Sequence, residues 1–310
     1  MAITAAMVKE LREMTGVGML ECKKALQEVE GDMDKAVEYL REKGLAASAK
    51  KASRIAAEGV VTARINPEGN IGCLVEVNSE SDFVAKNAVF QEYVAQVAEQ
   101  VTDCGAATVE EMLAQPWKFD TSVTVEQALS QKIAVIGEKL SIRRFEKFVL
   151  GEPGLLVSYI HGGGRIGVLL EVACEKASEE VSEMAKNICM QIAALKPEFL
   201  AVEDVSEEFK AKETEILTQQ AMNDPKNAGK KPEIIQKMIA GRLHKELKEF
   251  CLLEQPYVKE TDMTVGAYVQ SVAKAVGAPI KLVRFSRYET GEGLAKKEEN
   301  YAEEVAKLAK

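Results

Sequence analysis

The pattern of apolar residues along the chain predicts the same pair of elements twice. Residues 60–65 and 71–77 are β-rich runs on either side of the turn-forming stretch 66–70, which predicts a β-hairpin. Residues 155–160 and 166–172 repeat this arrangement around three consecutive glycines at 162–164. Apolar residues at helical spacing follow each hairpin and predict a helix. They are Phe90, Val94, Val97 and Val101 in the first case, and Met184, Ile188 and Ile192 in the second.

Identities at matched positions indicate that this repeat is an internal duplication. Nine residues of the first copy recur 95 positions later without a gap, and matching residues near the ends of the copies are 140 positions apart. Residues that both copies share are expected to maintain the fold, whereas a difference at matched positions is a candidate for function. The pairs at spacing 95 are Gly59/Gly154, Ile65/Ile160, Gly69/Gly164, Ile71/Ile166, Gly72/Gly167, Leu74/Leu169, Glu76/Glu171, Val77/Val172 and Glu80/Glu175, and those at 140 include Gly137/Gly277 and Arg144/Arg284.

The change of spacing from 95 to 140 locates an insertion of 45 residues in the second copy. Its apolar positions predict two antiparallel helices joined by a polar turn at 223–232. Helices of roughly 17 to 20 residues extend about 25 to 30 Å. Because such an arm buries little core, we expect it to reach a partner or another subunit.

Apart from this insertion, each copy reads strand, strand, helix, helix, strand, which predicts an α+β fold with antiparallel sheets. We expect a first core half at 56–148 and a second at 149–285, with the insertion at about 199–253. A C-terminal module at 286–310 is predicted to end in a short helix at 300–310.

The N-terminal residues 1–55 are predicted to form a separate helical module and a linker. Thr4 is a cap for a first helix with Val8, Leu11 and Met14 along one face, and Asp32 is a cap for a third helix that ends at Gly44. A second helix lies between them, and 46–57 reads as a polar helical linker. Met19 and Leu20, directly after a glycine turn, are either core residues or an exposed apolar contact.

Composition and charge exclude several classes of function. The net charge is −9 and the chain has no dense Lys/Arg stripe, which argues against nucleic acid as the main partner. There are two histidines, far apart, so a zinc site of the usual type has almost no ligands. No apolar run approaches the roughly 20 residues that span a bilayer, and there is no signal-peptide pattern, so we expect a cytoplasmic protein without a membrane partner. The six cysteines lack CxxC spacing and are predicted to be buried free thiols.

Sequence signatures of catalysis are missing as well. The chain has no GxxxxGK[ST] loop, no GxGxxG after a strand and no GxSxG elbow. His161 has no indicated nucleophile beside it and is more often a structural residue or a surface contact in such a place. We therefore predict no catalytic centre, no cofactor and no metal.

The two copies differ most informatively at Ser81-Asp82-Phe83-Val84, where the second copy has Lys176-Ala177-Ser178-Glu179. Ser81 is a candidate N-cap and Asp82 suits the positive end of a helix. Phe83 is in helical phase with Phe90, so periodicity alone favours a core residue. The matched Ser178 favours the alternative, because a scaffold that accepts serine there does not need phenylalanine to fold. An aromatic ring and a carboxylate at a helix tip would suit a wedge that enters a partner's pocket.

Segments that include this contrast resemble a known family. Residues 75–86, Val-Glu-Val-Asn-Ser-Glu-Ser-Asp-Phe-Val-Ala-Lys, and residues 15–26, Thr-Gly-Val-Gly-Met-Leu-Glu-Cys-Lys-Lys-Ala-Leu, strongly resemble signatures of the elongation factor Ts family. Residues 161–168 and 284–293 are also similar, and the resemblance runs through essentially the whole chain. Two departures are Ser81, where the family commonly has threonine, and a longer turn at 223–231.

The resemblance implies a guanine-nucleotide exchange factor for the GTPase elongation factor Tu, and no enzyme. The tip at Asp82-Phe83 would intrude beside the nucleotide's Mg²⁺ site so that GDP leaves. The N-terminal module, similar to ubiquitin-associated domains, and the C-terminal helix would grip the GTPase domain, and the part with His161 would contact a more distant domain. The inserted arm would be a coiled coil. The implied partner-binding residues are Ser81, Asp82, Phe83, Val84, Arg12, Met19, Leu20, Lys23 and His161.

Two rival interpretations stay open at this point. One is a non-enzymatic adaptor or assembly protein built from the same modules, and the other is an enzyme with an unrecognised carboxylate site. The oligomeric state is equally open, with a homodimer or a higher complex with the GTPase as alternatives.

Overall fold

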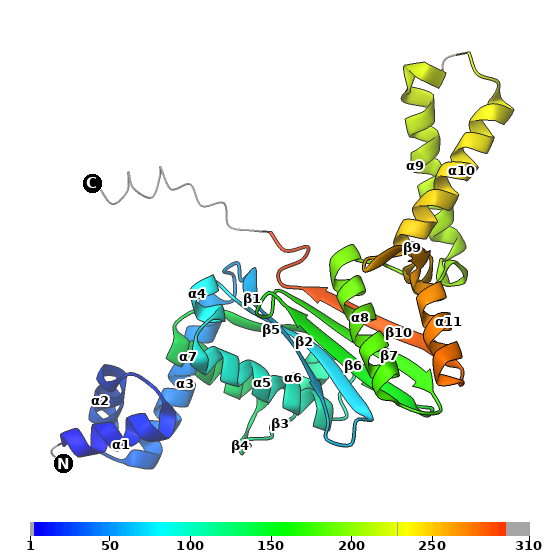
Figure 1. Ribbon diagram of the computed structural model, residues 1–310. Coiled ribbons are helices and arrows are strands. Elements are labelled where there is room, and N and C mark those ends of the chain that lie inside the picture. The colour runs from blue at the N-terminus through cyan, green and yellow to red at the C-terminus, as the bar shows by residue number, and fades with distance from the viewer. Residues whose placement is uncertain (1–2, 228, 296–310) are drawn as a thin grey trace.

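The structure is a computed structural model that describes residues 3–227 and 229–295. Figure 1 shows an elongated molecule with a helical bundle at one end, two sheets in the middle and a pair of helices that projects at the other end. Helices combine with antiparallel sheets throughout, which confirms the predicted α+β class.

Three helices form the N-terminal bundle, and two of them begin at the predicted caps. The Thr4 side chain accepts a hydrogen bond from the Met7 amide, and the Asp32 side chain accepts one from the Lys35 amide. One prediction is wrong: Met14 is 60% exposed, because it follows the last buried turn of its helix. The helices are α1 (Ala5–Thr15), α2 (Met19–Glu28) and α3 (Met33–Lys51), and their buried residues are Val8, Leu11, Cys22, Ala25, Leu26, Ala36 and Leu40.

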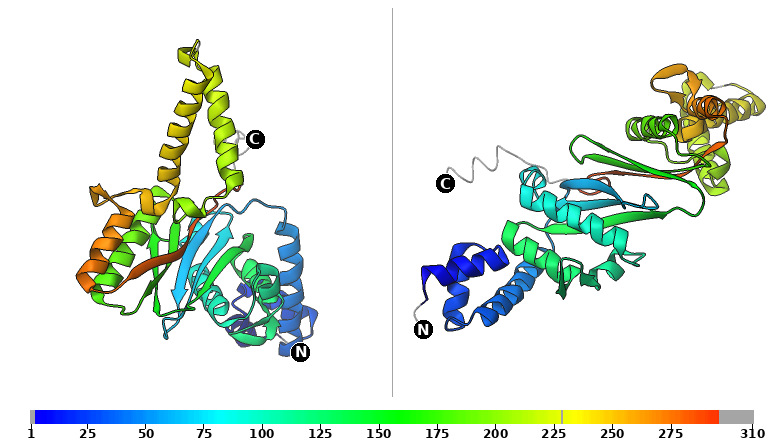
Figure 2. Two further views of the ribbon diagram at one scale, coloured as in Figure 1. Left: turned by 90° about the vertical axis from the view of Figure 1, so that its right-hand side faces the viewer. Right: turned by 60° about the horizontal axis from the view of Figure 1, so that its bottom comes forward.

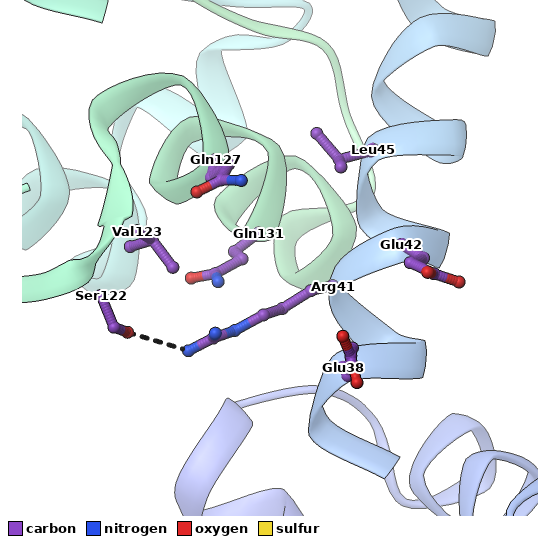
Figure 3. Close-up of a pocket in the computed structure, with 8 residues that line it drawn as sticks. All are labelled: Glu38, Arg41, Glu42, Leu45, Ser122, Val123, Gln127 and Gln131. Carbon is purple, nitrogen blue, oxygen red and sulfur yellow. Dashed lines mark hydrogen bonds between the residues drawn. The ribbon is translucent and has the colours of Figure 1, made fainter. Parts of the chain in front are cut away.

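The prediction that the third helix ends at Gly44 is also wrong, since α3 continues through Gly44 to Lys51 and takes up half of the expected linker. Gly44 is buried against α7 (Val125–Ile136), where a Cβ atom would already touch the Ser130 carbonyl oxygen at 3.5 Å. Glycine serves here for close helix packing. Arg41 strengthens the junction, with Nη2 3.4 Å from the Ser122 Oγ (Figure 3). A cavity of about 220 Å³ lies between the two elements.

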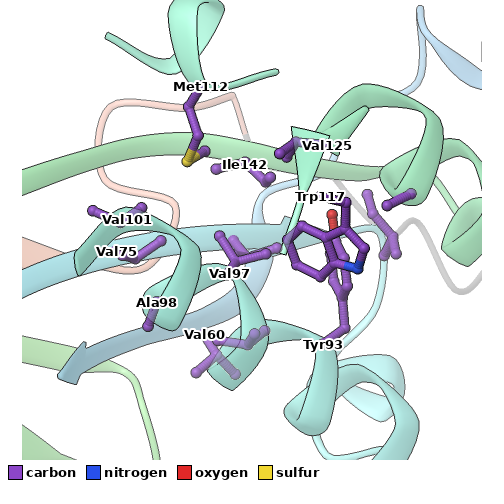
Figure 4. Packing of buried hydrophobic residues seen from close by; sticks show 14 of the residues in the cluster. Val60, Val75, Tyr93, Val97, Ala98, Val101, Met112, Trp117, Val125 and Ile142 are labelled. Carbon is purple, nitrogen blue, oxygen red and sulfur yellow. The ribbon is translucent and has the colours of Figure 1, made fainter. Parts of the chain in front are cut away.

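The first core half is a sheet in the order β1-β2-β5, covered by helices on one face (Figure 1). Its core includes Phe90 and Tyr93 from the long helix α5, and Trp117, whose ring centroid lies 5.9 Å from that of Tyr93 (Figure 4). The elements are β1 (Glu58–Ile65), β2 (Ile71–Ser79), α4 (Asp82–Ala85), α5 (Ala88–Asp103), α6 (Val109–Leu113), β3 (Pro116–Trp117), β4 (Asp120–Thr124), α7 and β5 (Leu140–Val149).

The second half repeats this plan with a sheet in the order β10-β7-β6. Its hairpin has the same register as the first: Gly59 lies opposite Asn78, and Gly154 lies opposite Ala173. Both halves also contain a small two-stranded hairpin, β3–β4 and β8–β9, that the sequence pattern did not predict. The elements are β6 (Gly154–His161), β7 (Ile166–Cys174), α8 (Glu179–Leu195), β8 (Pro256–Tyr257), β9 (Glu260–Thr264), α11 (Val265–Val276) and β10 (Ile280–Glu289).

The two sheets pack face to face through matched residues. A Cβ atom at Gly167 would lie 2.5 Å from Val61 Cγ1 and 2.8 Å from Leu74 Cδ1. At the matched Gly72, a Cβ atom would lie 3.1 Å from Leu156 Cδ1 and 3.2 Å from Leu169 Cδ1. Leu156 and Leu169 are the counterparts of Val61 and Leu74 at spacing 95. Each half therefore presents the same glycine to the same two apolar positions of the other half.

Two arginines make the same exchange between the halves. The guanidinium of Arg144 lies over the Tyr288 ring at 4.1 Å, and that of the matched Arg284 lies over the Phe148 ring at 4.2 Å. Arg144 also donates to the buried carboxylate of Glu76 at 2.6 Å, as Arg284 does to Glu171 at 2.7 Å. Cation–π contacts and charge-assisted hydrogen bonds thus repeat the symmetry of the apolar contacts.

The inserted segment forms two antiparallel helices that stand clear of both sheets (Figure 2). They are α9 (Glu207–Asn223) and α10 (Pro232–Phe250), of 17 and 19 residues. Leu217, Ala221 and Ile239 make a small buried contact along the arm. Short 3₁₀ turns lie beside these helices at Val202–Asp204, Pro225–Asn227 and Leu252–Glu254.

Beyond β10, a turn ties the chain to the first half. The Gly291 amide donates to the Glu76 carboxylate at 2.7 Å, and Arg143 Nη2 donates to the Glu292 carbonyl at 2.5 Å. The predicted terminal helix at 300–310 lies outside the described residues.

Two further predictions concern the cysteines and the membrane. All six cysteines are free and buried, as predicted. Among the described residues, no helix combines the length and the apolar character needed to cross a membrane.

Candidate partner-binding site

The segment in which the two copies differ forms a separate turn of helix, α4. Ser81 caps it, with the Val84 amide donating to Ser81 Oγ at 3.4 Å. Asn87 then caps α5 through a hydrogen bond from the Val89 amide at 2.8 Å. One long helix is thereby divided into α4 and α5. Val84 packs against the first core, while the opposite side of the turn faces solvent.

Phe83 is 82% exposed, so the interpretation of Phe83 as a core residue is wrong. Periodicity failed because the seven-position spacing from Phe83 to Phe90 corresponds to about two helical turns only if the helix is continuous, and it breaks at Lys86-Asn87. Phe90 is fully buried in α5. An exposed aromatic ring on a capped helical turn has the features of an interface anchor.

Asp82 lies beside Phe83 on the exposed side. Its carboxylate accepts a hydrogen bond from Lys86 Nζ at 2.6 Å. This hydrogen bond holds the pKa of Asp82 below its ordinary value. The carboxylate is therefore charged at neutral pH and open to a second cation or donor.

In the second copy, the matched residues do not form a separate turn. Its helix α8 begins at Glu179 with Ser178 as the N-cap, and the residues before it form a loop. At spacing 95 Glu179 matches Val84, so the first copy begins its helix two positions earlier than the second and interrupts it at Lys86-Asn87, which makes α4 a separate turn.

The Ser81 hydroxyl and amide both donate to the Glu138 carboxylate, at 2.6 and 2.9 Å. Glu138 lies in the turn between α7 and β5 and was missed at the sequence level. A signal for it exists: the position matched to Glu138 at spacing 140 is Ala278, so this residue also differs between the copies.

The N-terminal candidates lie on the surface of the helical bundle. Met19 is 42% exposed and Leu20 is 66% exposed, which removes the alternative that both are core residues. Arg12 and Lys23 are exposed as well. Met14, which the sequence pattern assigned to the core, adds a third exposed apolar side chain beside the same glycine turn.

His161 is exposed at the end of β6, and its Nδ1 lies 3.0 Å from the Tyr159 hydroxyl. The following turn rests on the first half, because the Gly164 carbonyl accepts a hydrogen bond from the Val61 amide at 2.7 Å. The candidates thus fall on three separate surfaces. Figure 1 shows α4 and the α1–α2 pair at the same end of the molecule, away from the arm.

Among residues 3–227 and 229–295, no group of three or more His, Cys, Asp or Glu side chains is arranged to hold a metal ion. Exposed apolar and charged side chains on a rigid two-sheet scaffold are typical of proteins that act by binding other proteins.

Comparisons with known proteins identify the family. A family model described as "Elongation factor TS" matches residues 80–292, more than half of the chain. Elongation factor Ts of Clostridium perfringens is 53% identical over 306 residues, which cover 99% of both chains. The same factor of Clostridioides difficile is 51% identical over 308 residues, again with 99% of both chains covered. That of Trichlorobacter lovleyi is 51% identical over 313 residues, covering 100% of this chain and 99% of the other.

The chain belongs to the elongation factor Ts family, which gives it a role in translation elongation. The resemblance inferred from residues 15–26 and 75–86 is confirmed.

Proposed function

We propose that this protein is a guanine-nucleotide exchange factor for elongation factor Tu and speeds the release of GDP. The observation that carries the proposal is the 82% exposure of Phe83 on a capped helical turn that the second copy lacks. The ring and the Asp82 carboxylate enter beside the partner's Mg²⁺ site and disturb its contacts with the metal and the phosphates.

Binding energy accounts for this activity without catalytic chemistry. An exchange factor binds the nucleotide-free GTPase in preference to the loaded one. By linkage, it reduces the affinity of the GTPase for the nucleotide by the same ratio as the nucleotide reduces the affinity of the GTPase for the exchange factor. It requires a broad contact, since specific interfaces commonly bury about 1,200–2,000 Å². We accordingly propose that the protein is not an enzyme and has no cofactor of its own.

The other exposed candidates extend the proposed contact. Arg12, Met19, Leu20 and Lys23 lie on the N-terminal bundle, which we take to be ubiquitin-associated-like, and they bind the GTPase domain. His161 binds a more distant domain of the partner. The arm acts as a coiled coil and supplies a further surface. The complex forms in the cytoplasm, and neither nucleic acid nor a membrane takes part.

Release of a fluorescent nucleotide tests the proposal directly. Elongation factor Tu is loaded with fluorescent GDP, and the decay of the signal is followed in excess unlabelled GDP at increasing concentrations of this protein. We expect the release rate to rise with concentration and to saturate. Release at the intrinsic rate at every concentration would refute the exchange function.

The adaptor interpretation predicts a different result in the same experiment. An adaptor binds elongation factor Tu without accelerating release, so a pull-down would be positive while the nucleotide stays bound. An isothermal titration of GDP into the complex separates the two, since only an exchange factor weakens GDP binding.

A further inference from the structure

Two acidic residues join the loop before α4 to the turn between α7 and β5. Glu138 accepts hydrogen bonds from the Ser81 hydroxyl at 2.6 Å and the Ser81 amide at 2.9 Å. Next to this contact, Glu80, the residue before Ser81, accepts a hydrogen bond from the amide of Lys139, the residue after Glu138, at 2.6 Å. The two segments are thus held by a reciprocal pair of carboxylate contacts, and hydrogen bonds to charged acceptors are stronger than neutral ones.

The same turn also holds the end of the N-terminal module. Lys139 Nζ donates to the carbonyl oxygens of Ala52 and Arg54, both at 2.7 Å. Arg54 Nη1 in turn lies 3.2 Å from Glu80. The exposed turn at α4 and the chain that leads to the helical bundle are therefore fixed to one point of the first half.

We call the contacts of Ser81 with Glu138 and of Lys139 with Glu80 the clamp, and the second copy shows the scaffold without it. Gly137 and its counterpart Gly277 both end their helices in the left-handed conformation, and the strands that follow begin at 140 and 280. Between them, Glu138 and Lys139 are replaced by Ala278 and Pro279. Alanine has no side-chain acceptor and proline has no amide hydrogen. The second copy thus lacks both groups of the clamp, and its helix begins later, at Glu179.

A clamp is needed because α4 is unstable by itself. A helix of four residues pays the cost of nucleation and gains almost no propagation. The exposed Phe83 ring adds no stabilising burial. Val84 and Ala85 hold one side of the turn in the core, and the Ser81 contacts with Glu138 hold its beginning.

We propose that Glu138 is a positioning residue that keeps the Asp82–Phe83 turn in the projecting orientation required for nucleotide exchange. In this proposal Glu138 acts through Ser81 and makes no contact of its own with the GTPase or its nucleotide. Preorganisation of this kind raises activity because the ordering cost is met before the partner binds. The proposal rests on the exchange function given above, and its structural part can be tested without the partner.

The experiment compares the intact protein with Glu138→Ala, which places at this position the residue of the second copy, and with Glu138→Gln, which keeps one acceptor oxygen. Glu175→Ala is the control, because it makes the same substitution at an exposed carboxylate of the second copy, the counterpart of Glu80, where the facing amide is replaced by Pro279. Hydrogen exchange of the amides in residues 81–86 is measured on the free proteins by mass spectrometry. The release of fluorescent GDP is measured at saturating and subsaturating concentrations, and urea unfolding reports global stability.

For Glu138→Ala we expect faster amide exchange confined to residues 81–86 and a saturating release rate about tenfold lower, the size of effect typical of a charge-assisted hydrogen bond. The half-saturating concentration should change much less, since the other surfaces are intact. The amide exchange and the release rate of Glu138→Gln should lie between those of Glu138→Ala and those of the unmodified protein. Glu175→Ala should match the unmodified protein in both measurements.

Unchanged amide exchange at 81–86 in Glu138→Ala, or a loss of activity that follows a lower midpoint of global unfolding, would overturn the positioning role. If the unmodified protein does not accelerate release but amide exchange at 81–86 responds as expected, the exchange function fails while the clamp is upheld.

Discussion

Two phenylalanines on consecutive helices provide the sharpest test of the candidate site. Phe83 on α4 is 82% exposed, and Phe90 on α5 is fully buried in the first core. Phe83→Ala and Phe90→Ala are therefore chemically identical changes in opposite environments. The structure predicts that the first removes function and leaves stability, whereas the second removes stability.

The expected magnitudes follow from burial. Full burial of a phenylalanine side chain contributes roughly 1.5–3 kcal/mol, so a side chain that is largely exposed contributes about 0.5 kcal/mol or less. Replacement of a fully buried phenylalanine by alanine costs about 3–5 kcal/mol, since a cavity remains. The two variants should therefore differ by at least about 2.5 kcal/mol in the free energy of unfolding. For nucleotide release, loss of a central interface anchor costs about 2 kcal/mol or more, which corresponds to roughly 30-fold.

The protein contains its own probe for this measurement. Trp117 is the single tryptophan and lies in the same buried cluster as Phe90. Urea titrations followed by tryptophan fluorescence give the unfolding free energies, and stopped-flow release of fluorescent GDP gives the exchange rates. A cost of several kcal/mol for Phe83→Ala would falsify the exposed position of the ring. Unimpaired exchange by a fully folded Phe83→Ala would refute its role as the wedge.

Three further outcomes are expected. Gly167→Ala should lower the free energy of unfolding by about 1–3 kcal/mol, because the added Cβ atom would clash between the sheets. Gly151→Ala is the control and should leave it unchanged, since a Cβ atom there meets no atom within 4 Å. Equal urea midpoints for the two variants would contradict the sheet packing. No thiol should react rapidly with a thiol reagent in the native protein and all six should react in urea, since all are buried; one fast native thiol would contradict this. The hydrogen bond from Lys118 keeps the pKa of Asp103 below its ordinary value, so its contribution is present above the ordinary carboxyl pKa and disappears as pH falls through the folded value. Lys118→Met should consequently lower the unfolding free energy by less than about 1 kcal/mol at pH 6 and leave it unchanged near pH 2. If the loss of unfolding free energy were the same at both pH values, the Lys118–Asp103 pair could not be its cause.

Much of the fold could be predicted from the sequence because its strongest signals are local or repeated. The two hairpins follow from β-rich runs beside turn residues, and the agreement between copies confirms their register. The arm follows from a change in spacing between matched residues. The small hairpins β3–β4 and β8–β9 were missed, since strands of two residues carry no periodic pattern.

The candidate site was harder to predict because it depends on breaks and on long-range contacts. In the sequence Phe83 has the helical phase of a core residue, but Ser81 and Asn87 cap two separate helices and so change the direction of its side chain. Whether such residues act as caps depends on tertiary packing. Gly44 resembles a helix end but is a close contact with α7. The contact between Ser81 and Glu138 joins residues 57 positions apart, which no local pattern reveals.

The reciprocal contact between the sheets has a consequence for the history of the chain. Gly72 meets Leu156 and Leu169, and Gly167 meets their counterparts Val61 and Leu74. A surface that pairs with an identical copy of itself is the signature of a twofold homodimer. The interface is thus one that two separate ancestral subunits would have made before their genes were joined. Once both subunits belong to one polypeptide, a change in one no longer has to occur in the other. One copy can then acquire the exposed Phe83 turn and the other the arm, while the shared glycines keep them together.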